Sequence, residues 1–252
     1  MYKRQIEACN GEEVTINFTT DNTGGVTTYD WSATGDVIGL PDDTTDITDS
    51  NTDITFTASN PDSEPREVTI TVTPIFTNDG AICTTDQEQV FTITVNPEPQ
   101  INNFEETICE GDTFASITPE DVTNGVVPAG TTYTWVISSS NNVEGGSAST
   151  AASATIPGSE LTLVAGTTSP QDLIYTVTPL SADQCEGDPF TVTITVNPVP
   201  QVEDSLDNAI CHNESYTYSP VNGEDGVVPS GVTYSWGTPS STSTEVLSLI
   251  HI

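Results

Sequence analysis

Basic residues are almost absent from this 252-residue sequence: three Lys and Arg stand against 37 Asp and Glu, for a formal net charge of −34. Binding to nucleic acid or to an anionic membrane surface depends on clustered Lys and Arg, so the composition argues against both kinds of partner. Long apolar runs are also missing, and none approaches the roughly 20 residues that a membrane-spanning helix needs. Because a chain this acidic repels itself, salt or divalent cations should favour its folded state.

Histidine is equally scarce, with His212 and His251 as the two present. Nucleophilic catalysis needs a base beside Ser or Cys, and a Cys–His metal site needs further ligands at close spacing. The sequence shows neither arrangement, and its carboxylates are too numerous for pairs of them to be informative. We therefore predict a segment without enzymatic activity.

Both ends of the chain carry an unusual sequence. Met1–Gln5 ("MYKRQ") and Leu247–Ile252 ("LSLIHI") read as translations of one DNA-sequencing adaptor in its two orientations. We interpret residues 1–5 and 247–252 as adaptor-derived and leave them out of the fold prediction. Residues 6–246 are then expected to be an internal piece of a longer protein.

The sequence does contain a long internal repeat. "TITVNPEPQ" at Thr92–Gln100 returns as "TITVNPVPQ" at Thr193–Gln201, and "GVVPAGTTYTW" at Gly125–Trp135 returns as "GVVPSGVTYSW" at Gly226–Trp236. Each complete unit runs from a first Cys through Tyr-x-Trp and "TVTP" to a second Cys and "TITVNP". A repeat of about 100 residues has the size of one small domain.

The repeat predicts three units, at residues 6–98, 99–200 and 201–246, of which the third is incomplete. Two prolines in three residues follow the last strand of each complete unit. They stiffen the connection toward an extended conformation. We expect a string of semi-rigid domains.

The apolar residues alternate with polar ones, which is typical of strands with one buried face. In "FTVTITVN" at Phe190–Asn197, Phe, Val and Ile share one face and Thr the other. No segment shows a convincing helical period. The fold prediction is all-β, as tandem immunoglobulin-like β-sandwiches.

An aromatic pair recurs in every unit, on one face of an alternating strand. These pairs are predicted to pack in the cores; the alternative is an exposed platform for a sugar. They are Tyr29 with Trp31, Tyr133 with Trp135, and Tyr234 with Trp236.

Cysteines also recur, with the first taken to open each unit's first strand and the second to lie on the hairpin between its last two strands. Both positions would fall at one pole of a sandwich, which predicts the disulfides Cys9–Cys83 and Cys109–Cys185 and leaves Cys211 unpaired. Loops of this length would each contribute about 4 kcal/mol in the chain-entropy model. Disulfides imply an oxidising, extracellular compartment; the alternative is reduced structural thiols.

No cofactor is predicted, and the acidic loops are expected to be solvated. The alternative is a calcium site at the second of these disulfides. If it forms, two "CEGD" segments meet at one pole, and their carboxylates are the hard oxygen ligands that Ca²⁺ takes. The candidate ligands are Glu110, Asp112, Glu186 and Asp188.

Taken in order, "CEGDTF", "VVPAGTTYTW", "YTVTP", a second Cys and "FTVTITVNP" resemble the PKD-like, immunoglobulin-like repeats of very large surface proteins from Bacteroidetes-type bacteria. The resemblance covers essentially all of residues 6–246. It implies secretion, display on the cell surface, and a role in adhesion, to surface glycans or other cell-surface proteins, or as a spacer. Three roles stay open: a non-catalytic stalk with a weak binding surface, accessory modules that present a secreted hydrolase or bind its polysaccharide, or a pure spacer without binding.

Overall fold

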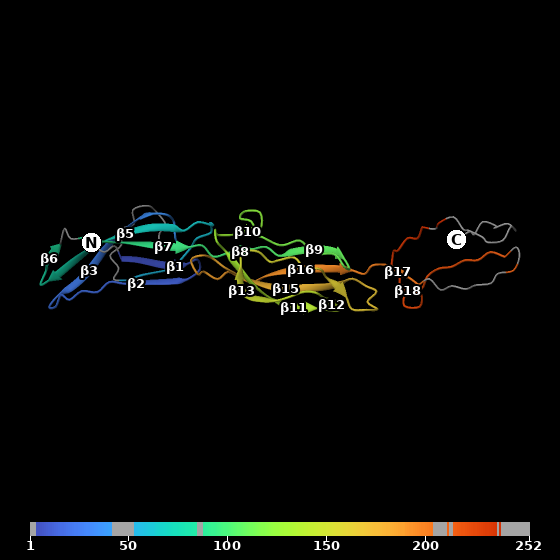
Figure 1. Ribbon diagram of the computed structural model, residues 1–252. Helices are drawn as coiled ribbons and strands as arrows, with labels where there is room; N and C mark the ends of the chain where they lie inside the picture. Colours follow the sequence, from blue (N-terminus) through green and yellow to red (C-terminus); the bar gives the residue numbers. More distant parts are fainter. Residues whose placement is uncertain are drawn as a thin grey trace.

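The computed structural model describes residues 4–41, 53–84, 88–203, 211, 214–235 and 237. Two β-sandwiches lie in a row and are followed by a third segment, as Figure 1 shows. The predicted tandem all-β fold is confirmed. Among the described residues, no helical segment has the length and apolar character of a membrane span.

The first sandwich contains β1 to β7. Its larger sheet has the order β1-β7-β5-β3, with β6 paired to β5, and the pair β2–β4 forms the facing layer. Alternate residues of β5 face the core, where Val68, Ile70 and Val72 are buried. The strands are β1 (Arg4–Cys9), β2 (Glu13–Asn17), β3 (Val26–Gly35), β4 (Asp53–Thr57), β5 (Arg66–Asn78), β6 (Ala81–Thr84) and β7 (Gln89–Asn96).

The second sandwich repeats this plan with β8 to β16. Its larger sheet has the order β13-β11-β15-β16-β9. The bridges Thr113↔Glu160 and Ile117↔Ile156 stand where β2 pairs with β4 in the first sandwich. The strands are β8 (Gln100–Ile101), β9 (Phe104–Cys109), β10 (Gly125–Val126), β11 (Thr132–Ser140), β12 (Val143–Glu144), β13 (Ser149–Ser153), β14 (Thr162–Leu163), β15 (Gln171–Leu180) and β16 (Phe190–Asn197).

Each sandwich encloses its own core of buried apolar side chains. One cluster runs from Ala8 to Val95 and the other from Ile108 to Val196. In β16 the apolar residues are buried and the threonines between them are half-buried, as the alternation predicts.

In each sandwich an early strand, β1 or β9, pairs in parallel with the last strand, β7 or β16. Cys9 is the register partner of Asn96, and Cys109 is the partner of Asn197. Both strands therefore begin at one pole, here called the N-terminal pole, and end at the C-terminal pole. Arg4 and Gln5 belong to the segment interpreted as adaptor-derived, yet they pair with Phe91 and Thr92 of β7. Main-chain pairing accepts most side chains.

The third segment starts as the second sandwich does. Its strands β17 (Gln201–Val202) and β18 (Gly226–Val227) form a short antiparallel ladder. The ladder matches the β8–β10 ladder of the second sandwich.

Candidate functional site at the junction of the sandwiches

The junction joins the C-terminal pole of the first sandwich to the N-terminal pole of the second. The connecting peptide between β7 and β8 contains Pro97 and Pro99. The hairpin between β15 and β16 lies against this peptide, and a Cβ on Gly187 would clash with the carbonyl oxygen of Pro99. The backbones can approach this closely because Gly187 has no side chain.

A disulfide crosses the junction. Cys9 ends β1 at the C-terminal pole of the first sandwich, and Cys185 lies on the β15–β16 hairpin of the second. The two residues are bonded, with a Cα–Cα distance of 5.6 Å and a sequence separation of 176. The hairpin is braced around the bond, since Cys185 N–H donates to Ser181 Oγ at 3.1 Å and its carbonyl accepts from Ser181 N–H at 2.9 Å.

The predicted pairings Cys9–Cys83 and Cys109–Cys185 are therefore wrong, and Cys83 and Cys109 are exposed free thiols. The error has a physical cause. The first cysteine of a unit ends its first strand, and that strand runs parallel to the last one. Cys109 and Cys185 thus lie at opposite ends of β16, which spans roughly 25 Å at about 3.3 Å per residue.

The alternative of a calcium site depended on the Cys109–Cys185 pairing and falls with it. Glu110 and Asp112 lie at the C-terminal pole of the second sandwich, where they accept from the N–H groups of Val199 (3.4 Å) and Cys109 (3.3 Å). Glu186 and Asp188 lie on the hairpin at its N-terminal pole. No group of three or more metal-binding side chains occurs within the described residues.

A loop of the first sandwich also reaches the second. The Ser63 hydroxyl donates to Asp121 Oδ2 at 2.7 Å, and Asp121 Oδ1 accepts from Val127 N–H at 2.9 Å. These donors stabilise the charged form, so they hold the pKa of Asp121 below its ordinary value, with the Val127 hydrogen bond as the larger cause.

Asn60 holds that loop in place. Its side chain is buried and donates to the carbonyl oxygens of Val95 (2.8 Å) and Glu64 (2.9 Å). Its own N–H donates to Asn10 Oδ1 at 2.8 Å. One buried amide thus ties the loop to the last strand and to the turn after Cys9.

Glu98 lies between the two prolines of the junction, where its negative charge is disfavoured. Partial burial and the nearby carboxylate of Asp188 raise the pKa of Glu98, while a hydrogen bond with the Asn10 side chain opposes the shift. The junction therefore holds this carboxylate at some cost at neutral pH.

The aromatic pairs lie in the cores of the two sandwiches. Tyr29, Trp31, Tyr133 and Trp135 are all buried, and Trp135 Nε1 donates to the Ser147 carbonyl at 2.9 Å. Burial raises the pKa of Tyr133 to about 12. In the third segment Tyr234 is 40% exposed, and Trp236 lies outside the described residues.

Residues 106–200, which are most of the second sandwich, match the PKD-like domain family. No curated protein matches the sequence. Among solved structures the chain is similar to fibronectin(III)-like modules of Clostridium thermocellum CbhA, at 12% identity over 84% of this chain and 95% of that one, with a TM-score of 0.28. It is also similar to chicken VE-cadherin EC1-2, at 13% identity over 79% and 100% of the two chains, with a TM-score of 0.30.

A third likeness is to a nucleoside hydrolase-related hypothetical protein from Saccharophagus degradans that is associated with carbohydrate metabolism. The identity is 12% and the TM-score 0.26, over 38% of this chain and 22% of that one. Likenesses at these identities and TM-scores carry no argument about this chain.

Proposed function

We propose that the chain is a non-catalytic stalk segment of a large secreted protein displayed on the cell surface. The Cys9–Cys185 disulfide carries this proposal, because it joins neighbouring sandwiches rather than closing one of them. A covalent bond between domains restricts how one domain is oriented on the next.

Two covalent connections cross the junction, the peptide at Pro97–Pro99 and the disulfide. A single connection allows neighbouring domains to swing and twist, whereas two spaced connections resist both motions. The Ser63–Asp121 hydrogen bond adds a further contact between the same two poles. The expected product is a stiff rod that holds a binding surface away from the cell.

The localisation is part of this proposal. A disulfide between domains persists in an oxidising compartment, which supports an extracellular location. The resemblance to Bacteroidetes surface repeats supports an adhesive role, with surface glycans or other cell-surface proteins as partners.

Small-angle X-ray scattering of the chain tests the stalk. The oxidised chain should fit one rigid arrangement of the two sandwiches. The Cys185→Ser variant should give a broader distribution of distances, while Cys83→Ser, which removes an exposed free thiol, should scatter like the unaltered chain. Equal flexibility of the oxidised chain and of Cys185→Ser would contradict the stalk.

A further inference from the structure

The first cysteine of every unit occupies the same local structure. Cys9, Cys109 and Cys211 each open a tight turn, in which the residue three positions later donates its N–H to the cysteine carbonyl at 3.0–3.2 Å. The side chain of that later residue accepts from the cysteine N–H in return, at 3.1–3.3 Å. Glycine takes positive φ in the turns after Cys9 and Cys109, where the backbone needs it.

The second cysteine of each complete unit also occupies one position. Cys83 pairs with Phe76, two residues after the proline of "TVTP" at Pro74. Cys185 is hydrogen-bonded to Ser181, two residues after the equivalent proline. Cys83 is therefore placed as Cys185 is, on the hairpin at the N-terminal pole, and Cys109 is placed as Cys9 is, at the C-terminal pole.

Independently of the cysteines, the second junction begins as the first does. The β8–β10 pairing of Gly125 with Ile101 returns as the β17–β18 pairing of Gly226 with Val202. In both ladders a Cβ on the glycine would clash with a carbonyl oxygen, that of Gln100 or of Gln201. The third segment thus begins with the same backbone ladder, directly after its connecting peptide, as the second sandwich does.

The loops that precede Gly125 and Gly226 differ in sequence but contain the same hydrogen bond. Val127 N–H donates to Asp121 Oδ1, and Val228 N–H donates to Asn222 Oδ1, both at 2.9 Å. Asn222 is therefore the structural equivalent of Asp121 in the third segment.

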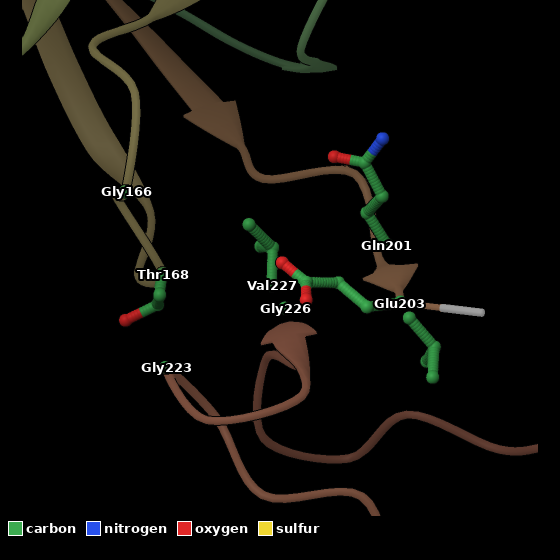
Figure 2. Close-up of a pocket in the computed structure, with 8 residues that line it drawn as sticks. Gly166, Thr168, Gln201, Glu203, Gly223, Gly226 and Val227 are labelled. Atoms are coloured by element: carbon green, nitrogen blue, oxygen red, sulfur yellow. The ribbon is translucent and has the colours of Figure 1, made fainter. Parts of the chain in front are cut away.

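The second junction contains an open pocket of about 410 Å³. Figure 2 shows Gly166 and Thr168 of the second sandwich on one side and Gly223, Gly226 and Glu203 of the third segment on the other. Thr168 stands three residues before β15, as Ser63 stands three residues before β5. The pocket thus lies between Thr168 and the loop of Asn222, where Ser63 binds Asp121 in the first junction.

We propose that Cys109 and Cys83 are each half of the same inter-domain disulfide, and that their partner is another module of this repeat. Cys109 forms a disulfide with the hairpin cysteine of a module that follows. Cys83 forms a disulfide with the strand-end cysteine of a module that precedes. Every sandwich of the stalk is then bonded to both neighbours through one disulfide per junction. The inference rests on the proposed stalk function and extends it to the whole array.

The bond forms by thiol–disulfide exchange with an oxidised low-molecular-weight disulfide. The Cys109 thiolate attacks one sulfur of that disulfide and releases one small thiol, and the hairpin thiolate then attacks the mixed disulfide and releases the second. Two protein thiols are oxidised by two electrons, and one small disulfide is reduced to two thiols.

A chain extended with its own second module tests the Cys109 half. Residues 202–252 are replaced by a second copy of residues 101–200, so that Gln201 leads into the copy as Gln100 leads into the second sandwich. After refolding in a glutathione redox buffer, peptide mapping should find Cys109 bonded to the copied hairpin cysteine in most molecules. In the Cys109→Ser variant that copied cysteine should react with iodoacetamide, while Cys9–Cys185 stays intact.

The Cys83 half is tested by placing a copy of residues 101–200 before Met1. Cys83 should then bond to the strand-end cysteine of the copy, whereas in the unaltered chain both Cys83 and Cys109 should be alkylated. Blue-shifted tryptophan emission shows that an extended chain has folded. Alkylation of Cys109 in the folded chain with the C-terminal copy, or of Cys83 in the folded chain with the N-terminal copy, would overturn the inference. Loss of Cys9–Cys185 itself would instead overturn the proposed function.

Discussion

Cys9 and Cys185 belong to different sandwiches and are joined by a disulfide that closes a loop across 176 residues. In the chain-entropy model a loop of this length stabilises the folded state by about 5 kcal/mol. Because the loop includes nearly all of both sandwiches, this stabilisation is shared between them. The two domains should therefore unfold as one cooperative unit when oxidised.

Reduction should separate the two unfolding transitions. We expect one calorimetric transition for the oxidised chain, and two at lower temperatures for Cys185→Ser or after reduction, with a loss of about 2–5 kcal/mol. Cys83→Ser is the matched control and should leave the thermogram unchanged, since Cys83 is an exposed free thiol. A single transition at the same temperature in Cys185→Ser would contradict the coupling.

Asn60→Ala should loosen the junction from the first sandwich. The substitution leaves the buried carbonyl of Val95 and the partly buried carbonyl of Glu64 without their donors, which costs about 1–3 kcal/mol. Chemical denaturation measures the loss. Asn22→Ala, at an exposed residue, should change the midpoint little; an equal shift in both variants would refute the structural role of Asn60.

Glu98→Gln should stabilise the junction at neutral pH. The raised pKa of Glu98 means that the folded state binds this proton more tightly than the unfolded state does. Stability therefore falls as pH rises from the unfolded value of 4.5 through the raised value, and the penalty is full above it. The group is half-buried and solvent still screens its charge, so the effect should be a few tenths of a kcal/mol. Thermal melts from pH 4 to pH 8 measure how stability depends on pH. The unaltered chain should show the decrease that Glu98 contributes, and Glu98→Gln should lack that contribution.

Ser63→Ala should shift the titration of Asp121. The Ser63 hydroxyl is one of the donors that lower the pKa of Asp121, so its removal should move that pKa back toward 3.8, the ordinary value for Asp. The lowered pKa contributes stability above the ordinary value that is lost as pH falls through the lowered one. NMR of the side-chain carboxyl follows the titration directly. An unchanged titration curve would show that the hydrogen bond between the sandwiches is absent in solution.

Gly187→Ala should prevent the hairpin from lying against the connecting peptide. The added Cβ would meet the Pro99 carbonyl oxygen, and either backbone must shift, at a cost of about 1–3 kcal/mol. The yield of the Cys9–Cys185 bond on refolding should fall with it. Gly237→Ala, where nothing lies within 4 Å of the added Cβ, is the control. Equal disulfide yields in the two variants would argue against this packing.

The strands and cores were predictable from the sequence because alternation is a local property. Phe190 to Val196 show this, since every second residue of that strand is buried. The repeat likewise predicted that Tyr133 and Trp135 would share a face, and both are buried.

The cysteine pairing was not predictable in the same way. It depends on β1 running parallel to β7, which is a contact between segments more than 80 residues apart. A local signal was nevertheless present. Gly11 and Gly111 follow their cysteines by two residues and mark a tight turn, so each cysteine stands at the end of a strand rather than at its start. The contacts of Ser63 and Asn60 have no such signal, because serine and asparagine are common in loops.

Disulfide mapping of the unaltered chain tests the central claim most directly. Cleavage at acidic residues under non-reducing conditions suits a sequence with 37 Asp and Glu, and mass spectrometry then identifies the linked peptides. We predict one linkage, in which the peptide of Cys9 carries that of Cys185. Linkage of Cys9 to Cys83 and of Cys109 to Cys185 would instead show that each sandwich is closed on itself, and would contradict the stapled stalk.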